Sequence, residues 1–122
     1  MSTEKEKHIT KPSQYALVHS RGRFWSSNLV IMKILPNGLE YHRYGFVVSK
    51  KVGKAVVRNR VKRLLREVMR QTPVKPGWDI VFIARPGAEK SGFAELKRTV
   101  WKLASKAGLF AEKYEENCLS PN

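Results

Sequence analysis

The chain has 122 residues, of which 42% are hydrophobic and 28% charged, and this composition predicts one globular domain rather than a disordered chain. Its 24 Lys and Arg residues against 10 Asp and Glu residues give a net charge of +14, which favours nucleic acid, an acidic membrane surface or an acidic protein as partner. A single cysteine, Cys118, excludes an internal disulfide and a cysteine-based zinc site, and the absence of a long apolar run predicts a cytoplasmic protein with no membrane partner.

Residues 1–49 predict a loose N-terminal segment, one short helix and strands. Residues 1–12 are polar and end at Pro12, so we expect a flexible leader. Residues 13–21 have helical spacing, with Ser13 as the N-cap and Gly22 as the stop. Residues 28–35 alternate as a strand whose two faces carry Leu29, Ile31 and Lys33, and Val30, Met32 and Ile34. A turn at 36–38 leads to a strand at 43–49, which predicts an antiparallel hairpin, and residues 24–27 leave room for a further short strand.

Residues 50–122 predict two amphipathic helices on either side of a buried strand. The first helix spans 56–71, with an apolar stripe of Val57, Val61, Leu64, Leu65, Val68 and Met69. Residues 78–84 are apolar on both faces, which is typical of a central strand, and residues 92–108 form the last helix. We therefore expect an α+β fold, a two-layer α/β sandwich of about four strands and three helices, as a single domain over 13–110 followed by an acidic tail at 111–122.

Nine basic residues gather in and just before the helix at 56–71: Lys50, Lys51, Lys54, Arg58, Arg60, Lys62, Arg63, Arg66 and Arg70. On a helical wheel, one stripe contains Arg58, Lys62 and Arg66. Beside it lie Asn59, Arg63 and Arg70, and Arg60 stands at the border. Like charges four residues apart destabilise a helix unless an anion binds them, and an ordinary solvated face mixes signs, whereas here only Glu67 opposes the cations. The stretch therefore predicts contact with RNA or DNA phosphates.

Catalytic motifs are not recognisable in the sequence. The Gly53-Lys54 pair lacks the other residues of a phosphate-binding nucleotide loop, because Val48 stands where glycine is needed and Ala55 where Ser or Thr is needed. The three histidines are far apart along the chain, and no paired carboxylates suit acid–base catalysis. We expect no protein-held metal and no small-molecule substrate.

Residues 45–67, GFVVSKKVGKAVVRNRVKRLLRE, resemble the signature of the bacterial ribonuclease P protein family. The hallmark of that family is an Arg-Asn-Arg triplet in a basic helix, here Arg58-Asn59-Arg60, after a Ser-Lys-Lys-x-Gly segment, here at 49–53. Weaker similarity runs from about Tyr15 to Phe110. The resemblance implies an α/β sandwich of the ribosomal protein S5 domain 2-like type, with a left-handed crossover around the basic helix, the opposite of the usual hand.

The resemblance also implies a function and a set of partners. The protein would be the non-catalytic subunit of the endonuclease that removes the 5′ leader of precursor tRNA. Its large RNA subunit would be the catalyst and would hold the magnesium ions. The partners would be ribonuclease P RNA and precursor tRNA. Two alternatives remain open: a general RNA-binding or ribosome-associated protein, and a DNA-binding protein. A strand precedes the basic helix where a helix-turn-helix needs a helix, which disfavours the DNA-binding alternative.

Two groups of residues receive roles from the resemblance. The RNA-binding group comprises Lys50, Lys51, Lys54, Arg58, Asn59, Arg60, Lys62, Arg63 and Arg66. A cleft between the sheet and the first and second helices would hold the single-stranded leader, lined by Tyr15, His19, Ile31 and Lys33, with Lys62 at its edge. Related proteins often have aromatic residues near positions 19 and 33, so we expect less base stacking in this chain.

Overall fold

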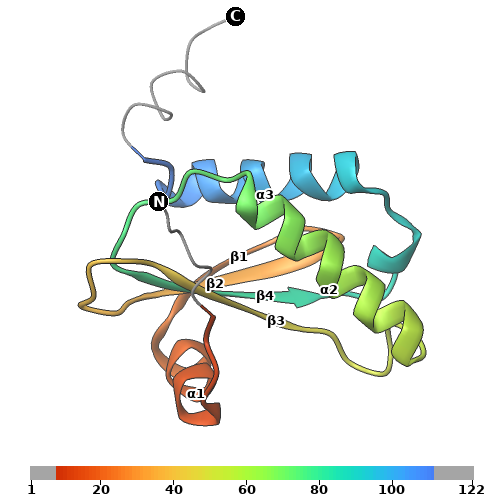
Figure 1. The fold of residues 1–122 in the computed structure, drawn as a ribbon, viewed down its shortest axis with the longest axis horizontal. Helices are drawn as coiled ribbons and strands as arrows, with labels where there is room; N and C mark the ends of the chain where they lie inside the picture. Colours follow the sequence, from red (N-terminus) through yellow and green to blue (C-terminus); the bar gives the residue numbers. More distant parts are fainter. Residues whose placement is uncertain (1–7, 112–122) are drawn as a thin grey trace, which may run out of the picture.

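The computed structural model describes residues 8–111, which form a four-stranded sheet with helices on both faces (Figure 1). Helices α2 and α3 cover one face of the sheet, and the short α1 lies alone on the other face. The elements in chain order are α1 Pro12–Arg21, β1 Arg23–Ser26, β2 Val30–Pro36, β3 Arg43–Val47, α2 Ala55–Arg70, β4 Trp78–Ala84, the 3₁₀ turn η1 Ala88–Lys90, and α3 Phe93–Ala107. The predicted α+β class, with three helices and four strands, is confirmed. The acidic tail from residue 112 lies outside the described residues.

The strand order β1-β2-β4-β3 corrects the predicted hairpin of β2 and β3. Strand β4 lies between them, antiparallel to β2 and parallel to β3. Because β4 is the strand that is apolar on both faces, the central position removes more of its apolar surface from water than an edge position would. Since β3 and β4 are adjacent and parallel, α2 forms the crossover connection between them.

The main core lies between the sheet and the two longer helices. Strand β2 turns Val30, Met32 and Ile34 toward it, as the alternation predicts. Both helices bury apolar stripes at helical spacing: Val61, Leu65, Val68 and Met69 from α2, and Leu96, Val100, Leu103 and Ala104 from α3. Helix α3 ends at Gly108, whose φ of 71° lies in the left-handed region that glycine adopts without strain. No helix within residues 8–111 is both long and apolar enough to cross a membrane.

Residues 8–12 are not part of a flexible leader, which corrects the predicted boundary. The side chain of Ile9 is only 4% exposed, and its N–H donates a hydrogen bond of 3.0 Å to the Tyr44 carbonyl. This apolar side chain therefore ties the N-terminal segment to strand β3, where the sequence showed only a polar stretch. Residues 1–7 lie outside the described part of the chain.

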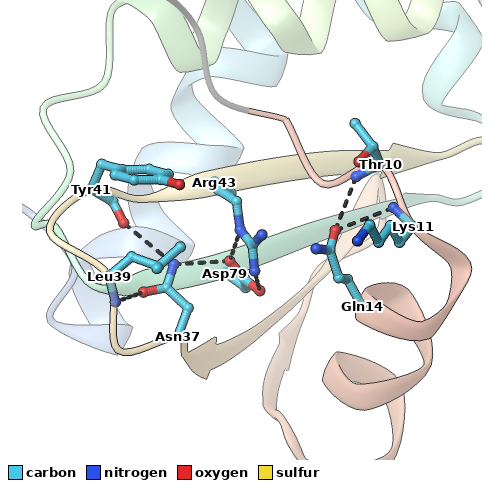
Figure 2. A network of polar contacts seen from close by, with 8 residues as sticks. All are labelled: Thr10, Lys11, Gln14, Asn37, Leu39, Tyr41, Arg43 and Asp79. Atoms are coloured by element: carbon cyan, nitrogen blue, oxygen red, sulfur yellow. Dashed lines mark hydrogen bonds and ion pairs between the residues drawn. The ribbon is translucent and has the colours of Figure 1, made fainter.

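The predicted N-cap of α1 at Ser13 is also wrong. The helix begins with Pro12 as its first residue and Lys11 as its N-cap. The side chain of Gln14 accepts hydrogen bonds from the N–H groups of Thr10 and Lys11, at 3.1 and 3.2 Å (Figure 2). Gly22 ends the helix as predicted, but in an extended conformation. A Cβ at Gly22 would lie 2.5 Å from the Val18 carbonyl oxygen, so close packing explains this glycine.

A partly buried ion pair joins Arg43, the first residue of β3, to Asp79, the second residue of β4. Arg43 donates two hydrogen bonds to Asp79, from Nε to Oδ1 at 2.8 Å and from Nη2 to Oδ2 at 2.7 Å (Figure 2). The hydrogen bond with Asp79 raises the pKa of Arg43 above its ordinary value, and burial opposes this rise. Asn37 also donates to Asp79, at 2.9 Å, and to the Tyr41 carbonyl at 3.3 Å. The network fixes the β2–β3 connection against the central strand.

Candidate nucleic-acid interface

The loop before α2 projects three lysines from a buried anchor. Val52 is 4% exposed and belongs to the main core, and its N–H donates to the Ser49 carbonyl at 3.0 Å. The flanking residues Lys50, Lys51 and Lys54 are all exposed. Because the loop is pinned at its centre, these ammonium groups stand at the N-terminal end of α2, where the helix dipole also favours anions.

The polar and basic residues of α2 differ in exposure, which adds detail to the arrangement predicted from the helical wheel. Asn59, Arg60, Arg63 and Arg70 are exposed. The predicted stripe of Arg58, Lys62 and Arg66 is only half-exposed, because it borders the buried stripe of Val61, Leu65 and Met69. Long basic side chains can pack their stems against the protein while keeping the charged group in water. We call the set Lys54, Arg58, Asn59, Arg60, Lys62, Arg63 and Arg66 the α2 face.

Two arginines of the α2 face are tethered by backbone carbonyls. Arg58 Nη1 donates to the Gly53 carbonyl at 3.1 Å, and Arg60 Nη1 donates to the Glu89 carbonyl of η1 at 3.1 Å. A carbonyl accepts a hydrogen bond without carrying a formal charge, so each guanidinium is oriented and still keeps its full positive charge. Each guanidinium also retains further N–H donors for a second partner.

The carboxylates of the described residues do not neutralise the α2 face. Glu67 pairs with Arg70, which is not part of the α2 face, at 2.9 Å. The Glu89 carboxylate accepts instead from the Gly87 N–H at 2.8 Å, and backbone hydrogen bonds lower the pKa of this carboxyl below its ordinary value. Within residues 8–111, none of the basic residues of the α2 face forms an ion pair with a carboxylate. The arginines therefore remain available for phosphates.

The four residues predicted to line a leader cleft do share one side of the molecule. Lys33 and Ile31 project from β2 to the face that α1 covers in part, and α1 supplies Tyr15 and His19. Partial burial lowers the pKa of His19 below its ordinary value, and the positive charge of Lys33 lowers it further, so these two side chains lie within electrostatic range. We call this side the α1 face.

Helix α2 does not contribute to the α1 face, which corrects part of the predicted cleft. Figure 1 shows α1 and α2 on opposite sides of the sheet. Lys62 belongs to α2 and is half-exposed in the other layer. The amphipathic pattern showed which side of each helix is buried, but it did not show which face of the sheet each helix covers.

Tyr15 is held against strand β3. Its hydroxyl lies so close to Gly45 that a Cβ at this position would overlap it. Burial raises the pKa of Tyr15 above its ordinary value, and a hydrogen bond with the backbone of Phe46 opposes this rise. The glycine therefore makes room for the ring of Tyr15, and the ring has a fixed position at one border of the α1 face.

We expect Gly45→Ala to displace the Tyr15 ring at a cost of about 1–2 kcal/mol in the free energy of unfolding, measured by urea denaturation. The cost stays moderate because the overlapping atoms are at the far end of a side chain that can rotate. The same change in a Tyr15→Ala background removes the overlap and is expected to cost less. Equal costs in both backgrounds would show that Tyr15 and Gly45 are not coupled.

Sequence reasoning missed three residues of the α1 face. Ile83 is half-buried beside Ile31, Val47 is half-buried on the far side of Ile83, and Phe24 of β1 is 64% exposed next to Lys33. Their positions follow from the pairing register, which joins segments far apart in the sequence. The only local signal for Phe24 was the alternation in a strand of four residues, which is too short to assign a face.

Two further observations concern sites outside these faces. Within residues 8–111, no three His, Cys, Asp or Glu side chains come close enough to hold a metal ion. A hollow of about 570 Å³ runs along α3 between Phe93, Trp101 and Phe110. Neither the α1 face nor the α2 face contributes a residue to it, so it is separate from the predicted interface.

Comparisons with known proteins identify relatives of this chain and structures with the same fold. A family model described as Ribonuclease P matches residues 3–108. The ribonuclease P protein component of Dehalococcoides mccartyi (strain CBDB1) is 51% identical over 108 residues, covering 88% of this chain and 90% of that protein. The structure is similar to that of the Staphylococcus aureus RNase P protein, with a TM-score of 0.78, 25% identity, and coverage of 88% of this chain and 100% of that one. For the Thermotoga maritima RNase P protein the TM-score is 0.73 and the identity 27%, over 80% of this chain and 94% of that one. The matched range includes every residue of both faces.

Proposed function

The chain belongs to the ribonuclease P protein family, and on this premise we propose that its α2 face binds ribonuclease P RNA while its α1 face holds the 5′ leader of precursor tRNA. As a subunit of the ribonucleoprotein endonuclease, the protein takes part in the processing of tRNA 5′ ends. The two faces lie on opposite sides of the sheet, so the protein can contact both RNAs at once.

The observation that carries the proposal is the state of the arginines on the α2 face. They are held by a packed helix, two of them are oriented by carbonyls, and no carboxylate of the described residues neutralises them. A preformed array of guanidinium groups loses little side-chain entropy when it meets phosphates, and it binds them bidentately. An RNA backbone offers the repeated phosphates that such an array requires.

Catalysis and metal binding would belong to the partner RNA. Magnesium prefers carboxylate and phosphate oxygens, and the described residues bring no such cluster together. The protein would lower the repulsion between the two RNAs, so that magnesium ions bind the complex more tightly. We place the protein in the cytoplasm, where precursor tRNA is made in bacteria. Family membership favours this function over a general RNA-binding or ribosome-associated role.

Reconstitution with a bacterial ribonuclease P RNA tests the proposal. At low magnesium, we expect the protein to stimulate removal of the leader from precursor tRNA by the RNA. The matched control is the same RNA at high magnesium, where the protein should have a smaller effect. A lack of stimulation at low magnesium, with the protein demonstrably bound to the RNA, would leave only the general RNA-binding alternative.

A further inference from the structure

The exposed phenylalanine of β1 lies in line with the basic residue at the centre of the α1 face. The register pairs Phe24 with Lys33, Lys33 with Val81, and Val81 with Gly45. Directly paired residues project to the same side of a sheet, so these four residues form one row across all four strands. The row ends under Tyr15, whose hydroxyl lies against Gly45.

The row places two aromatic side chains, Phe24 and Tyr15, at opposite borders of the α1 face. Val81 between them is fully buried in one cluster with Val18 of α1, so the accessible apolar floor comes from the neighbouring row. Three strand spacings separate the backbones of Phe24 and Gly45, a distance of about 14 Å. Lys33 lies between them, next to Phe24, and the neighbouring row supplies Ile31 and Ile83. A cation and an apolar floor between aromatic rings are the elements with which proteins hold single-stranded nucleic acid without reading its sequence.

Exposure alone would not distinguish Phe24, because single exposed apolar residues are common on protein surfaces. Its place in the row beside Lys33 distinguishes it from other exposed apolar residues. Cross-strand neighbours have Cβ atoms about 5 Å apart, so the side chains of Phe24 and Lys33 start next to each other on the same face of the sheet. Lys33 itself cannot stack on a base in the way an aromatic side chain does, and the adjacent strand supplies the ring instead.

We infer that Phe24 is a leader-contacting residue, which stacks on a base of the single-stranded 5′ leader while Lys33 contacts the adjoining phosphate. This inference rests on the proposed function, because it assumes that the leader crosses the α1 face. The interaction does not depend on base identity, since every base has a π-face. Phe24 therefore adds affinity for unpaired leaders of sufficient length rather than for a particular leader sequence.

The test uses the reconstituted holoenzyme and two precursor tRNAs, one with a long unpaired leader and one with a single leader nucleotide. We expect Phe24→Ala to weaken binding of the long-leader precursor by about tenfold, the loss of one base–aromatic stack, and to leave the short-leader precursor unchanged. Phe24→Tyr should bind like the original protein. Phe24→Leu, which keeps the apolar bulk without a ring, should behave like Phe24→Ala.

Salt dependence and a matched control separate stacking from other effects. Phe24→Ala should leave the slope of log affinity against log salt unchanged, whereas Lys33→Ala should reduce it by about 0.7, the value for one phosphate of a single strand. Leu17 is 47% exposed on α1 and lies outside the row, so Leu17→Ala should have no effect on either precursor. Unchanged unfolding midpoints would show that all variants fold.

The possible failures are distinguishable. If the original protein binds both precursors equally well, the leader does not cross the α1 face, and both this inference and that part of the proposed function are wrong. If the original protein prefers the long leader and Phe24→Ala keeps that preference, only the role of Phe24 is refuted. Full binding by Phe24→Leu would also refute it, because apolar bulk rather than the ring would then suffice.

Discussion

Replacement of Asp79 by alanine is expected to lower the free energy of unfolding by about 3 kcal/mol. The Asp79 side chain is 7% exposed and accepts two hydrogen bonds from Arg43, whose side chain is 20% exposed, and one from Asn37. Alanine would leave a partly buried guanidinium and an amide without their acceptor, and this desolvation cost exceeds the cost of losing the contact alone. Urea denaturation of the two proteins measures the difference.

The double variant distinguishes the interaction between Arg43 and Asp79 from the other contacts that each residue makes. Arg43→Ala alone should also destabilise strongly, because it leaves a buried carboxylate without its cation. Arg43→Ala combined with Asp79→Ala should cost clearly less than the sum of the two single changes, because neither charge is then left unpaired. Simple additivity, or a loss below about 1 kcal/mol for Asp79→Ala, would contradict the role of this pair in fixing the central strand.

The helices of the main layer could be predicted because their signal is local. In the buried stripes of α2 and α3, each apolar residue follows the previous one within one or two helical turns, so the pattern can be read from neighbouring residues. The observed helices differ from the predicted ones by one residue at each end. The same holds for β4, whose apolar character on both faces indicated a central position. The α2 face followed from the sequence for the same reason, since its residues are neighbours along one helix.

The arrangement of these elements could not be derived from local patterns. The hairpin of β2 and β3 was expected because the two strands are consecutive, but the apolar surface of β4 outweighs chain proximity. The place of Phe24 beside Lys33 depends on the register, and the burial of Ile9 depends on a strand more than thirty residues away. The cap of α1 was misplaced because Pro12 takes the first helical position, and Gln14, the third residue of the helix, accepts hydrogen bonds from the N–H groups of Thr10 and Lys11 that precede it.

The second large effect is expected at the α2 face. Arg58→Ala and Arg60→Ala should each weaken binding to ribonuclease P RNA by about 1–3 kcal/mol and reduce the salt slope by about 1. Both arginines are oriented by carbonyls, and they lie on opposite flanks of the helix. Their effects should therefore be nearly additive, so the double variant is expected to lose about 2–6 kcal/mol, which is roughly thirtyfold to twenty-thousandfold in affinity. Filter binding over a range of salt concentrations measures both quantities.

Two control variants decide whether the loss of RNA affinity comes from the geometry of the arginine contacts or from the lower overall charge of the protein. Arg98 is exposed on α3, so Arg98→Ala removes the same charge from a surface outside both faces and should change RNA affinity little. Arg58→Lys keeps the charge but loses the planar fork, because an ammonium group cannot donate to the Gly53 carbonyl and to two phosphate oxygens with the same rigid geometry. We therefore expect Arg58→Lys to retain the salt slope while recovering only part of the affinity. If Arg98→Ala weakens binding as much as Arg58→Ala, the RNA responds to the total charge of the protein rather than to the arginines of the α2 face, because direct contacts act only on the phosphates that they touch.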